Sequence, residues 1–406
     1  MAHGDVVTEV KESKENHKLW QDIPHDIAHQ ILRRIGSLAG SVSLANVCRN
    51  WGAAARSYSY SMFPRLTLPD GAFFSVPDNA AEHLLPLSPG STEARCCGSL
   101  GGGWLVLVRD CRSDRRDRAR HGALRRCING LCCCYLTNLF TKATLPLPEL
   151  ATLHHEIEAS IFIDKIISTK APDDAGCVFA VLIHGGDQEI IFCRPGKGSC
   201  NAKLGDHILD MVFCRGDKLY VLTQGEGLFI LGLGEDKDGK PAVSIAEQVI
   251  AECHYPSFPI LDIWGSHIVE VHYLRHYLVV SRGCLLMVRR WLGDPYKVNA
   301  GNGDRTLGFE VFKLGSGSSE WTEVKGLDGE ALLVGKRGSV SISSSSCDGT
   351  RDDCIYFVYD AMAAKAIVED PFRDSGVYSM KDDTIVPFLR KVAPGPGRWF
   401  PTWFSA

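Results

Sequence analysis

The sequence lacks long apolar runs, and no stretch approaches the roughly 18 consecutive apolar residues that are needed to span a membrane as a helix. Residues 1–17 are polar and charged, without the apolar centre of a signal peptide, and we expect them to form a flexible tail. Acceptor sites of the form Asn-x-Ser/Thr are also missing. These absences argue against secretion and against a membrane partner, and they predict a protein of the cytoplasm or nucleus.

Cysteine is common, but its usual structural arrangements are missing. The 16 cysteines are spread over 406 residues and include no Cys-x-x-Cys pair. We therefore expect free thiols rather than a disulfide framework or a zinc site. His272 and His276 have the spacing of two metal ligands on one helix face, but they lie in a strand-like run with no Glu between them. We predict no metal and no cofactor.

Signatures of enzymes are absent as well. The chain has no Gly-x-Ser-x-Gly elbow, no Gly-x-Gly-x-x-Gly after a strand and no complete phosphate-binding loop, so we predict no catalytic residues. The net charge of -4 argues against a protein that coats nucleic acid. Residues 109–126 are locally basic, with eight arginines and three aspartates. A nucleic-acid or nuclear-import patch is the alternative there, but we interpret the segment as a solvated loop between two strands.

The first strong pattern that is present lies between Trp20 and Ile35. Apolar residues recur there every four positions, as on one face of a helix, with Leu32 beside them: Ile23, Ile27, Ile31 and Ile35. Pro24 suits the first turn of such a helix, and Asp22 is its expected cap.

A second helical face follows, with Ser43 as its expected cap. Its apolar residues occur at intervals of three and four: Leu44, Val47, Cys48, Trp51, Ala55 and Tyr58. Together the two faces predict a helical hairpin or a three-helix unit over residues 18–62. A unit of that size buries little surface, so its large apolar side chains are expected to need a partner.

Beyond Pro69 the sequence is of another kind. Short apolar or alternating runs, such as residues 102–108, 177–185 and 207–223, are bounded by Gly, Asp, Asn and Pro. The last of these contains an Arg-Gly-Asp turn between two predicted strands. We therefore predict a large all-β domain over residues 66–400. A β-propeller is the expected architecture because circular repetition of blades leaves few open edges, but no strict repeat period occurs that would predict the number of blades.

The helical unit resembles an F-box. That motif opens with Leu-Pro-x-Asp-Leu, continues through Ile-Leu-x-Arg-Leu and ends in Val-Cys-Arg-x-Trp. The same order and spacing occur here at residues 23–27, 31–35 and 47–51, with Ile in place of Leu at three positions. The apolar character of the motif is kept.

The remainder of the chain resembles the plant family of F-box proteins that carry a C-terminal, kelch-like β-propeller of poorly known function. The most specific stretch is the run "GFEVFKLGSGSSEWTEVKGLDGEALLVGKRGSVSI" at residues 308–342. The run "NLFTKAT" departs from the Asn-Pro-x-Thr-Gly turn of that family, with Leu139 and Lys142 in place of Pro and Gly. This departure concerns the conformation of one turn rather than the fold.

The resemblance implies the substrate-recognition subunit of a Skp-cullin-F-box ubiquitin ligase. The F-box docks on a Skp-family adaptor, and through it on a cullin-RING ligase, while the propeller binds an unidentified protein substrate. Such a subunit is a tether without bond chemistry of its own. The residues that the resemblance assigns to the adaptor are the positions of the motif: Ile23, Pro24, Ile27, Ile31, Leu32, Ile35, Leu44, Val47, Cys48 and Trp51.

Two other functions stay open at this point. One is a β-propeller interaction protein outside ubiquitin transfer, whose helices only pack on the propeller. Burial of Leu32 and Trp51 within the monomer favours that function, whereas a receptor is expected to leave an apolar helical face exposed. The other is a propeller hydrolase, which predicts His and carboxylate groups that converge at one end of the channel.

Overall fold

The computed structural model describes most of the chain after residue 19. The described residues are 20, 22–59, 62–67, 72–83, 94–109, 134–147, 162–184, 188–205, 207–252, 273–293, 305–315, 317, 319–347, 349–360, 372, 374–388 and 401–404. The predicted tail lies outside them, and so does the predicted arginine-rich loop after Arg109.

Helices occur only in the N-terminal part of the described chain, where the helical unit is predicted: α2 (His25–Ile35), α3 (Leu38–Ala45) and α4 (Arg49–Ser59). α2 follows Pro24 and ends at Gly36, whose φ of 64° is the left-handed conformation that closes many helices. No described helix is long and apolar enough to form a membrane span.

The two predicted helix caps are wrong. The residue before α2 is Pro24, and no side chain caps that helix, so Asp22 lies too far from its first turn. α3 is capped by Ser37, whose hydroxyl accepts a hydrogen bond from Gly40 N at 2.9 Å. Ser43 lies inside α3, because the predicted second helix is two helices that are separated after Ala45.

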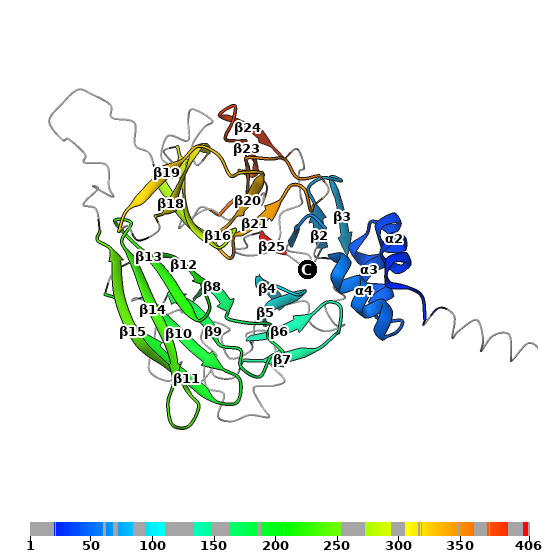
Figure 1. Cartoon of the computed structure of the whole chain (residues 1–406), viewed down its shortest axis with the longest axis horizontal. Coiled ribbons are helices and arrows are strands. Elements are labelled where there is room, and N and C mark those ends of the chain that lie inside the picture. The colour runs from blue at the N-terminus through cyan, green and yellow to red at the C-terminus, as the bar shows by residue number, and fades with distance from the viewer. Residues whose placement is uncertain are drawn as a thin grey trace, which may run out of the picture.

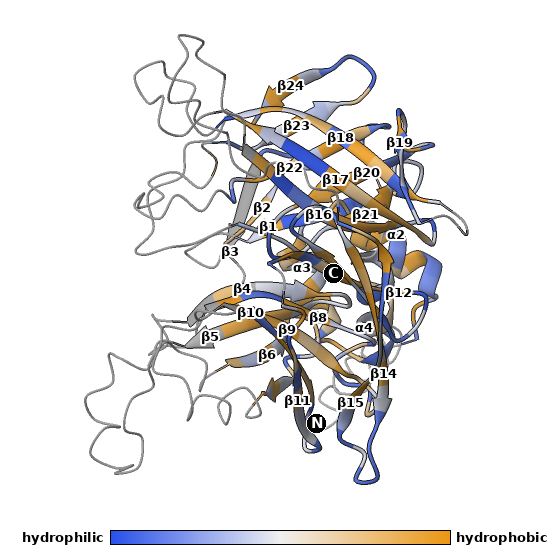
Figure 2. Ribbon diagram, turned by 90° about the vertical axis from the view of Figure 1, so that its left-hand side faces the viewer, coloured by the Kyte–Doolittle hydropathy of each residue, from blue (hydrophilic) through white to orange (hydrophobic). Residues whose placement is uncertain are grey.

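The rest of the described chain forms six sheets around a common centre, with the helices at the rim beside β3 (Figure 1). The predicted β-propeller is therefore confirmed, and its blade count is six. Figure 2 shows hydrophobic residues along the strands of the blades and hydrophilic residues at many of the turns.

Blade 1 contains β1 (Arg65–Thr67), β2 (Ala72–Ser75), β3 (Ala80–His83) and β25 (Thr402–Phe404). Blade 2 contains β4 (Ala94–Leu100), β5 (Trp104–Arg109), β6 (Cys134–Asn138) and β7 (Thr144–Pro146). Blade 3 contains β8 (Phe162–Ser168), β9 (Phe179–His184), β10 (Gln188–Arg194) and β11 (Gly198–Ala202).

Blade 4 contains β12 (Ile208–Cys214), β13 (Lys218–Thr223), β14 (Leu228–Glu235) and β15 (Pro241–Ile250). Blade 5 contains β16 (Tyr273–Ser281), β17 (Cys284–Leu292), β18 (Thr306–Leu314) and β19 (Trp321–Val324). Blade 6 has five strands, β20 (Glu330–Val334), β21 (Val340–Ser343), β22 (Cys354–Phe357), β23 (Gly376–Ser379) and β24 (Thr384–Pro387), with β20 and β22 paired in parallel.

The C-terminal strand closes the ring. β25 pairs antiparallel with β1, where Trp403 lies opposite Leu66, and it also lies beside β4 of blade 2. The indole Nε1 of Trp403 donates a hydrogen bond to Val334 O of blade 6 at 3.0 Å. The last strand therefore joins three blades, and the described strands of the propeller run from Arg65 to Phe404.

Each pair of neighbouring blades encloses an apolar cluster, and a further cluster fills the helical unit. The cluster between blades 1 and 2 also contains two residues of α3, Leu38 and Val42, which pack with Phe73, Phe140 and Phe404. The helical unit thus shares a core with the propeller instead of hanging from a linker.

Two predicted turns can be followed in detail. Residues 215–217 join β12 and β13, and Arg215 and Gly216 have positive φ, so the Arg-Gly-Asp hairpin is confirmed. In the turn after β6, Lys142 has a φ of 59° and takes the left-handed conformation that glycine usually supplies. Asn138 Oδ1 holds this turn by accepting hydrogen bonds from Phe140 N at 2.9 Å and Thr141 N at 3.0 Å.

Candidate functional site

The motif residues of the helical unit separate into a buried and an exposed group. Leu32 of α2 and Trp51 of α4 are 0% and 3% exposed and pack together with Ala28. Trp51 Nε1 also donates a hydrogen bond to Trp20 O at 3.0 Å. Because these side chains fill the space between α2 and α4, Leu32 and Trp51 stabilise the unit from inside, and direct contact with an adaptor is no longer expected of them.

The exposed group forms the outer surface of the unit. Ile27, Ile35 and Val47 are 39%, 42% and 52% exposed, and Pro24 is exposed as well. Trp20 is 58% exposed, although the motif gives no reason to select it. The remaining predicted contacts are half-buried against the interior cluster: Ile23, Ile31, Leu44 and Cys48.

A third face of the unit is fixed to the propeller through α3. Besides the buried side chains of Leu38 and Val42, Arg65 Nη2 of β1 donates a hydrogen bond to Gly36 O at 3.3 Å. The sequence prediction missed Leu38 and Val42, although their spacing of four is the signal of a helical face. Gly40 is required in α3, because a Cβ atom there would lie 2.3 Å from Cγ2 of Ile35.

A cluster of charged side chains joins blades 4 and 5. Glu226, in the turn between β13 and β14, accepts hydrogen bonds from His276 Nε2 at 2.8 Å and Arg289 Nε at 2.5 Å. Burial by itself raises the pKa of the Glu226 carboxyl, but His276 and Arg289 lower it to about 2. Arg289 also contacts Glu310 and lies over the ring of Phe312. His272, the other predicted metal ligand, lies outside the described residues.

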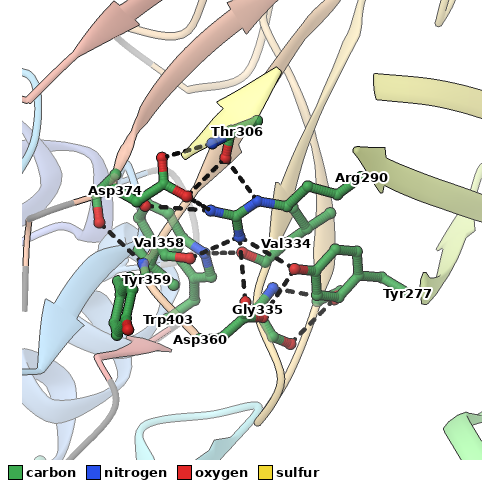
Figure 3. Close-up of polar contacts among 12 residues, drawn as sticks. Tyr277, Arg290, Thr306, Val334, Gly335, Val358, Tyr359, Asp360, Asp374 and Trp403 are labelled. Carbon is green, nitrogen blue, oxygen red and sulfur yellow. Dashed lines mark hydrogen bonds and ion pairs between the residues drawn. The ribbon is translucent and has the colours of Figure 1, made fainter. Parts of the chain in front are cut away.

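A second charged cluster lies between blades 5 and 6 around Arg290, which is 1% exposed (Figure 3). Arg290 Nη2 donates to Asp374 Oδ2 at 2.7 Å, and Nη1 donates to Asp360 Oδ1 at 3.2 Å. Tyr277 donates its hydroxyl hydrogen to Asp360 Oδ2 at 2.8 Å, and Arg290 Nε donates to Thr306 Oγ1 at 2.8 Å. Burial, followed by the Asp360 charge, raises the pKa of the Tyr277 hydroxyl far above its usual range. These groups bridge two blades as one satisfied network.

Both clusters pair carboxylates with arginines, the first in a half-buried place and the second in the interior of the propeller. A general base needs a carboxylate or imidazole with a pKa near the working pH, whereas Glu226 has a pKa of about 2. Within the described residues, no group of three or more His, Cys, Asp and Glu side chains has the geometry of a metal site. The described clusters pair charged side chains of neighbouring blades with one another.

The sequence of the propeller matches one known family over most of its length. Residues 73–379 match the family described as KIB1-4 beta-propeller. The chain belongs to the KIB1-4 β-propeller family. The kelch-like character that the sequence suggested stays a prediction, because the description of the matched family does not include it.

A plant protein is similar to this KIB1-4 family member over most of the chain. The chain is 21% identical over 365 residues to F-box protein At2g26160 of Arabidopsis thaliana, and the match covers 84% of this chain and 95% of that protein. The match extends over most of both proteins, which supports the predicted kinship with F-box proteins of plants.

Solved structures share only a remote likeness with this KIB1-4 propeller. AofleA from Arthrobotrys oligospora is 10% identical with a TM-score of 0.33, and the match covers 86% of this chain and 92% of that chain. A mutant of AofleA in which three arginines are replaced by alanine gives a TM-score of 0.32, with the same identity and coverage.

Proposed function

We propose that this KIB1-4 family member is the substrate-recognition subunit of a Skp-cullin-F-box ubiquitin ligase. In this proposal the helical unit docks on a Skp-family adaptor, and through it on a cullin-RING ligase, in the cytoplasm or nucleus. The propeller binds a protein substrate, and the subunit catalyses no reaction itself.

The observation that carries the proposal is the exposure of Ile27, Ile35 and Val47. The interior of the helical unit is already filled by Leu32 and Trp51, and α3 is already packed on the propeller, so these three apolar side chains are left without a cover. Complete burial of a fully exposed side chain of this size contributes about 1.5 to 3 kcal/mol, and these side chains are about half exposed, so each adds less than that against an association cost of about 4 to 15 kcal/mol. Several of them must therefore act together.

The name of the Arabidopsis relative adds independent support, because it is an F-box protein that matches 84% of this chain. The three motif segments occur in the order of an F-box, at residues 23–27, 31–35 and 47–51. This order supports a Skp-family protein as the partner. Neither argument identifies the substrate.

A binding measurement with a purified Skp-family adaptor tests the proposal. We expect the full chain to retain the adaptor, and an Ile35→Glu, Val47→Glu variant to lose at least about 90% of the retained adaptor, since each lost burial contributes up to about 1.5 to 3 kcal/mol. These exposed positions are better than Leu32 and Trp51 for the purpose, because substitution of a buried residue also unfolds the unit.

The matched control is a Leu307→Glu, Val386→Glu variant of the propeller. Leu307 and Val386 are each 50% exposed, so the same chemical change is made on a surface away from the helices. We expect this variant to bind like the unmodified chain. Equal binding by both variants, or no binding by the unmodified chain, contradicts the proposal.

One observation favours the interaction protein outside ubiquitin transfer. Leu32 and Trp51 are buried within the monomer, and α3 is part of the propeller core, as expected of helices that serve the fold. If the full chain fails to bind the adaptor but captures a protein through its propeller, this second function is the better account. The three exposed apolar side chains are the reason that we place it second.

A further inference from the structure

Blade 6 is wound differently from the blades that precede it. In blades 2 to 5 the innermost strand comes first in the sequence, as β4, β8, β12 and β16 do. In blade 6 the chain enters at β20, turns inward to β21, which contacts β16, and then returns to the other side of β20 as β22. The turn at residues 335–339, between β20 and β21, therefore leads into the innermost strand of this blade.

A bulge in β8 changes the direction of Asp164. The pairing of β8 with β9 shifts by one residue between Ile163 and Lys165, so Asp164 is an extra residue in that strand. Ile163 packs in the core between blades 2 and 3, whereas Lys165 pairs with Asp210 of blade 4 at 2.6 Å. The residues on the two sides of the bulge therefore face opposite neighbours, and the bulge re-aims the side chain between them.

The partner of Asp164 lies across the ring. Lys336 Nζ, in the turn before β21, is 2.7 Å from Asp164 Oδ1, so this ion pair joins blade 6 to blade 3. The contacts of the innermost strands run from β25 through β4, β8, β12 and β16 to β21, which places blades 3 and 6 on opposite sides of the ring (Figure 1). The contacts between blades at Glu226, Arg290 and Trp403 join neighbouring blades instead.

The ion pair of Lys336 and Asp164 is sheltered from solvent. The two side chains are 21% and 12% exposed, so salt screens their attraction less than that of a surface pair. The turn that carries Lys336 is held by a hydrogen bond from Gly338 N to Gly335 O at 3.1 Å. Loss of either partner leaves the other charge in a place with little water, which lowers stability. The pair therefore resists a movement of blade 6 away from blade 3.

We infer that this ion pair is a latch that keeps the ring closed. The seam of the ring lies between blades 6 and 1, where β25 follows blade 6 in the sequence but pairs with β1. β25 has three residues, so few backbone hydrogen bonds hold that seam. Opening of the seam moves blade 6 away from the opposite side of the ring, and the ion pair opposes this movement. The latch is a property of the propeller and does not depend on the proposed adaptor.

Hydrogen exchange of the full chain, followed by mass spectrometry, tests the latch. For Lys336→Met we expect exchange in β25 and β1 to become about tenfold faster, because opening of the seam no longer has to break the ion pair. β13 and β14 of blade 4 should keep their protection. A charge-swapped variant, Lys336→Asp with Asp164→Lys, should recover most of the protection of the seam. The matched control is Lys325→Met, which removes an ion pair with Glu323 whose side chains are 83% and 43% exposed, and it should exchange like the unmodified chain.

The outcomes distinguish a latch from a local contact. If Lys336→Met speeds exchange only at residues 335–339 and in β8, or nowhere, the inference is overturned. It is also overturned if the charge-swapped variant exchanges as fast as Lys336→Met, because the lost protection then comes from packing and not from the charges. Asp164→Asn keeps the size of the side chain, and it answers the same question if Lys336→Met does not fold.

Discussion

The interior of the helical unit and the junction of blades 5 and 6 are both buried, but apolar side chains fill the first and charged side chains fill the second. Leu32 and Arg290 are 0% and 1% exposed. Leu32 packs among apolar residues of the same short helical unit. Arg290 is held by Tyr277, Asp360 and Asp374, which lie 13, 70 and 84 positions away in the sequence.

Because of this difference, we expect mutations in the two regions to lower the stability of the fold in different ways. An apolar core loses stability in proportion to the atoms removed, because its neighbours relax only in part. A buried charge network fails more abruptly, because removal of one partner leaves the others charged and unsatisfied. The helical unit is therefore expected to tolerate conservative changes better than the Arg290 network.

The largest expected effect comes from Arg290→Met. The change leaves the carboxylates of Asp360 and Asp374 buried without their cation, and we expect a loss of about 3 to 5 kcal/mol in the free energy of unfolding. Denaturant unfolding measures it. The control is Lys325→Met, which removes an ion pair with Glu323 whose two side chains are 83% and 43% exposed, and it should cost at most about 1 kcal/mol. Equal losses in the free energy of unfolding would show that the buried Arg290 network is no more sensitive to mutation than a surface ion pair.

Leu32→Ala is expected to act locally and somewhat more weakly. The cavity between α2 and α4 should cost about 2 to 5 kcal/mol of helical-unit stability. Hydrogen exchange should show lost protection in α2 and α4 while β12 to β14 keep theirs. Ile35→Ala, at an exposed position, serves as the control and should change protection little. Loss of protection throughout the propeller would mean that the helices and the blades unfold as one unit.

The smallest expected effect is a pH dependence that comes from Glu226. Since His276 and Arg289 lower its pKa from 4.5 to about 2, the carboxylate stabilises the fold above pH 4.5, and this contribution is lost as the pH falls towards 2. One such group gives a slope of at most about 1.4 kcal/mol per pH unit. Unfolding measured across this window should show a shallower slope for Glu226→Gln.

The control for this measurement is Glu235→Gln. Glu235 pairs with Arg194 but is 56% exposed, so its substitution should leave the slope unchanged. If the Glu226 and Glu235 variants behave alike, the buried cluster between blades 4 and 5 does not contribute to acid stability.

Local patterns predicted the secondary structure well. The spacing of the isoleucines predicted α2, and alternating runs bounded by turn residues predicted strands such as β12 and β13. The caps were wrong because Ser, Asp and Asn occur near many helix ends, and only the backbone path decides which of them reaches an N–H group. A three-helix unit was one of the two predicted alternatives, but the boundary between α3 and α4 was not located because apolar periodicity continues across it.

Long-range pairings were beyond the reach of these patterns. No local signal links Trp403 to Leu66 and Val334, so closure of the ring by the last strand could not be anticipated. The same holds for Arg290, because an arginine in an alternating strand is usually solvated and its burial depends on two distant aspartates.

The sequence by itself determined that a small amphipathic helical unit precedes a large β domain, because helix and strand periods are local properties of the chain. Only the tertiary structure decided which motif residues point inward. All four of these motif residues are large and apolar: Leu32, Trp51, Ile35 and Val47. Packing of α4 on α2 and of α3 on the propeller buries Leu32 and Trp51 and leaves Ile35 and Val47 exposed. Exposure depends on neighbours from distant parts of the chain, and periodicity alone does not specify them.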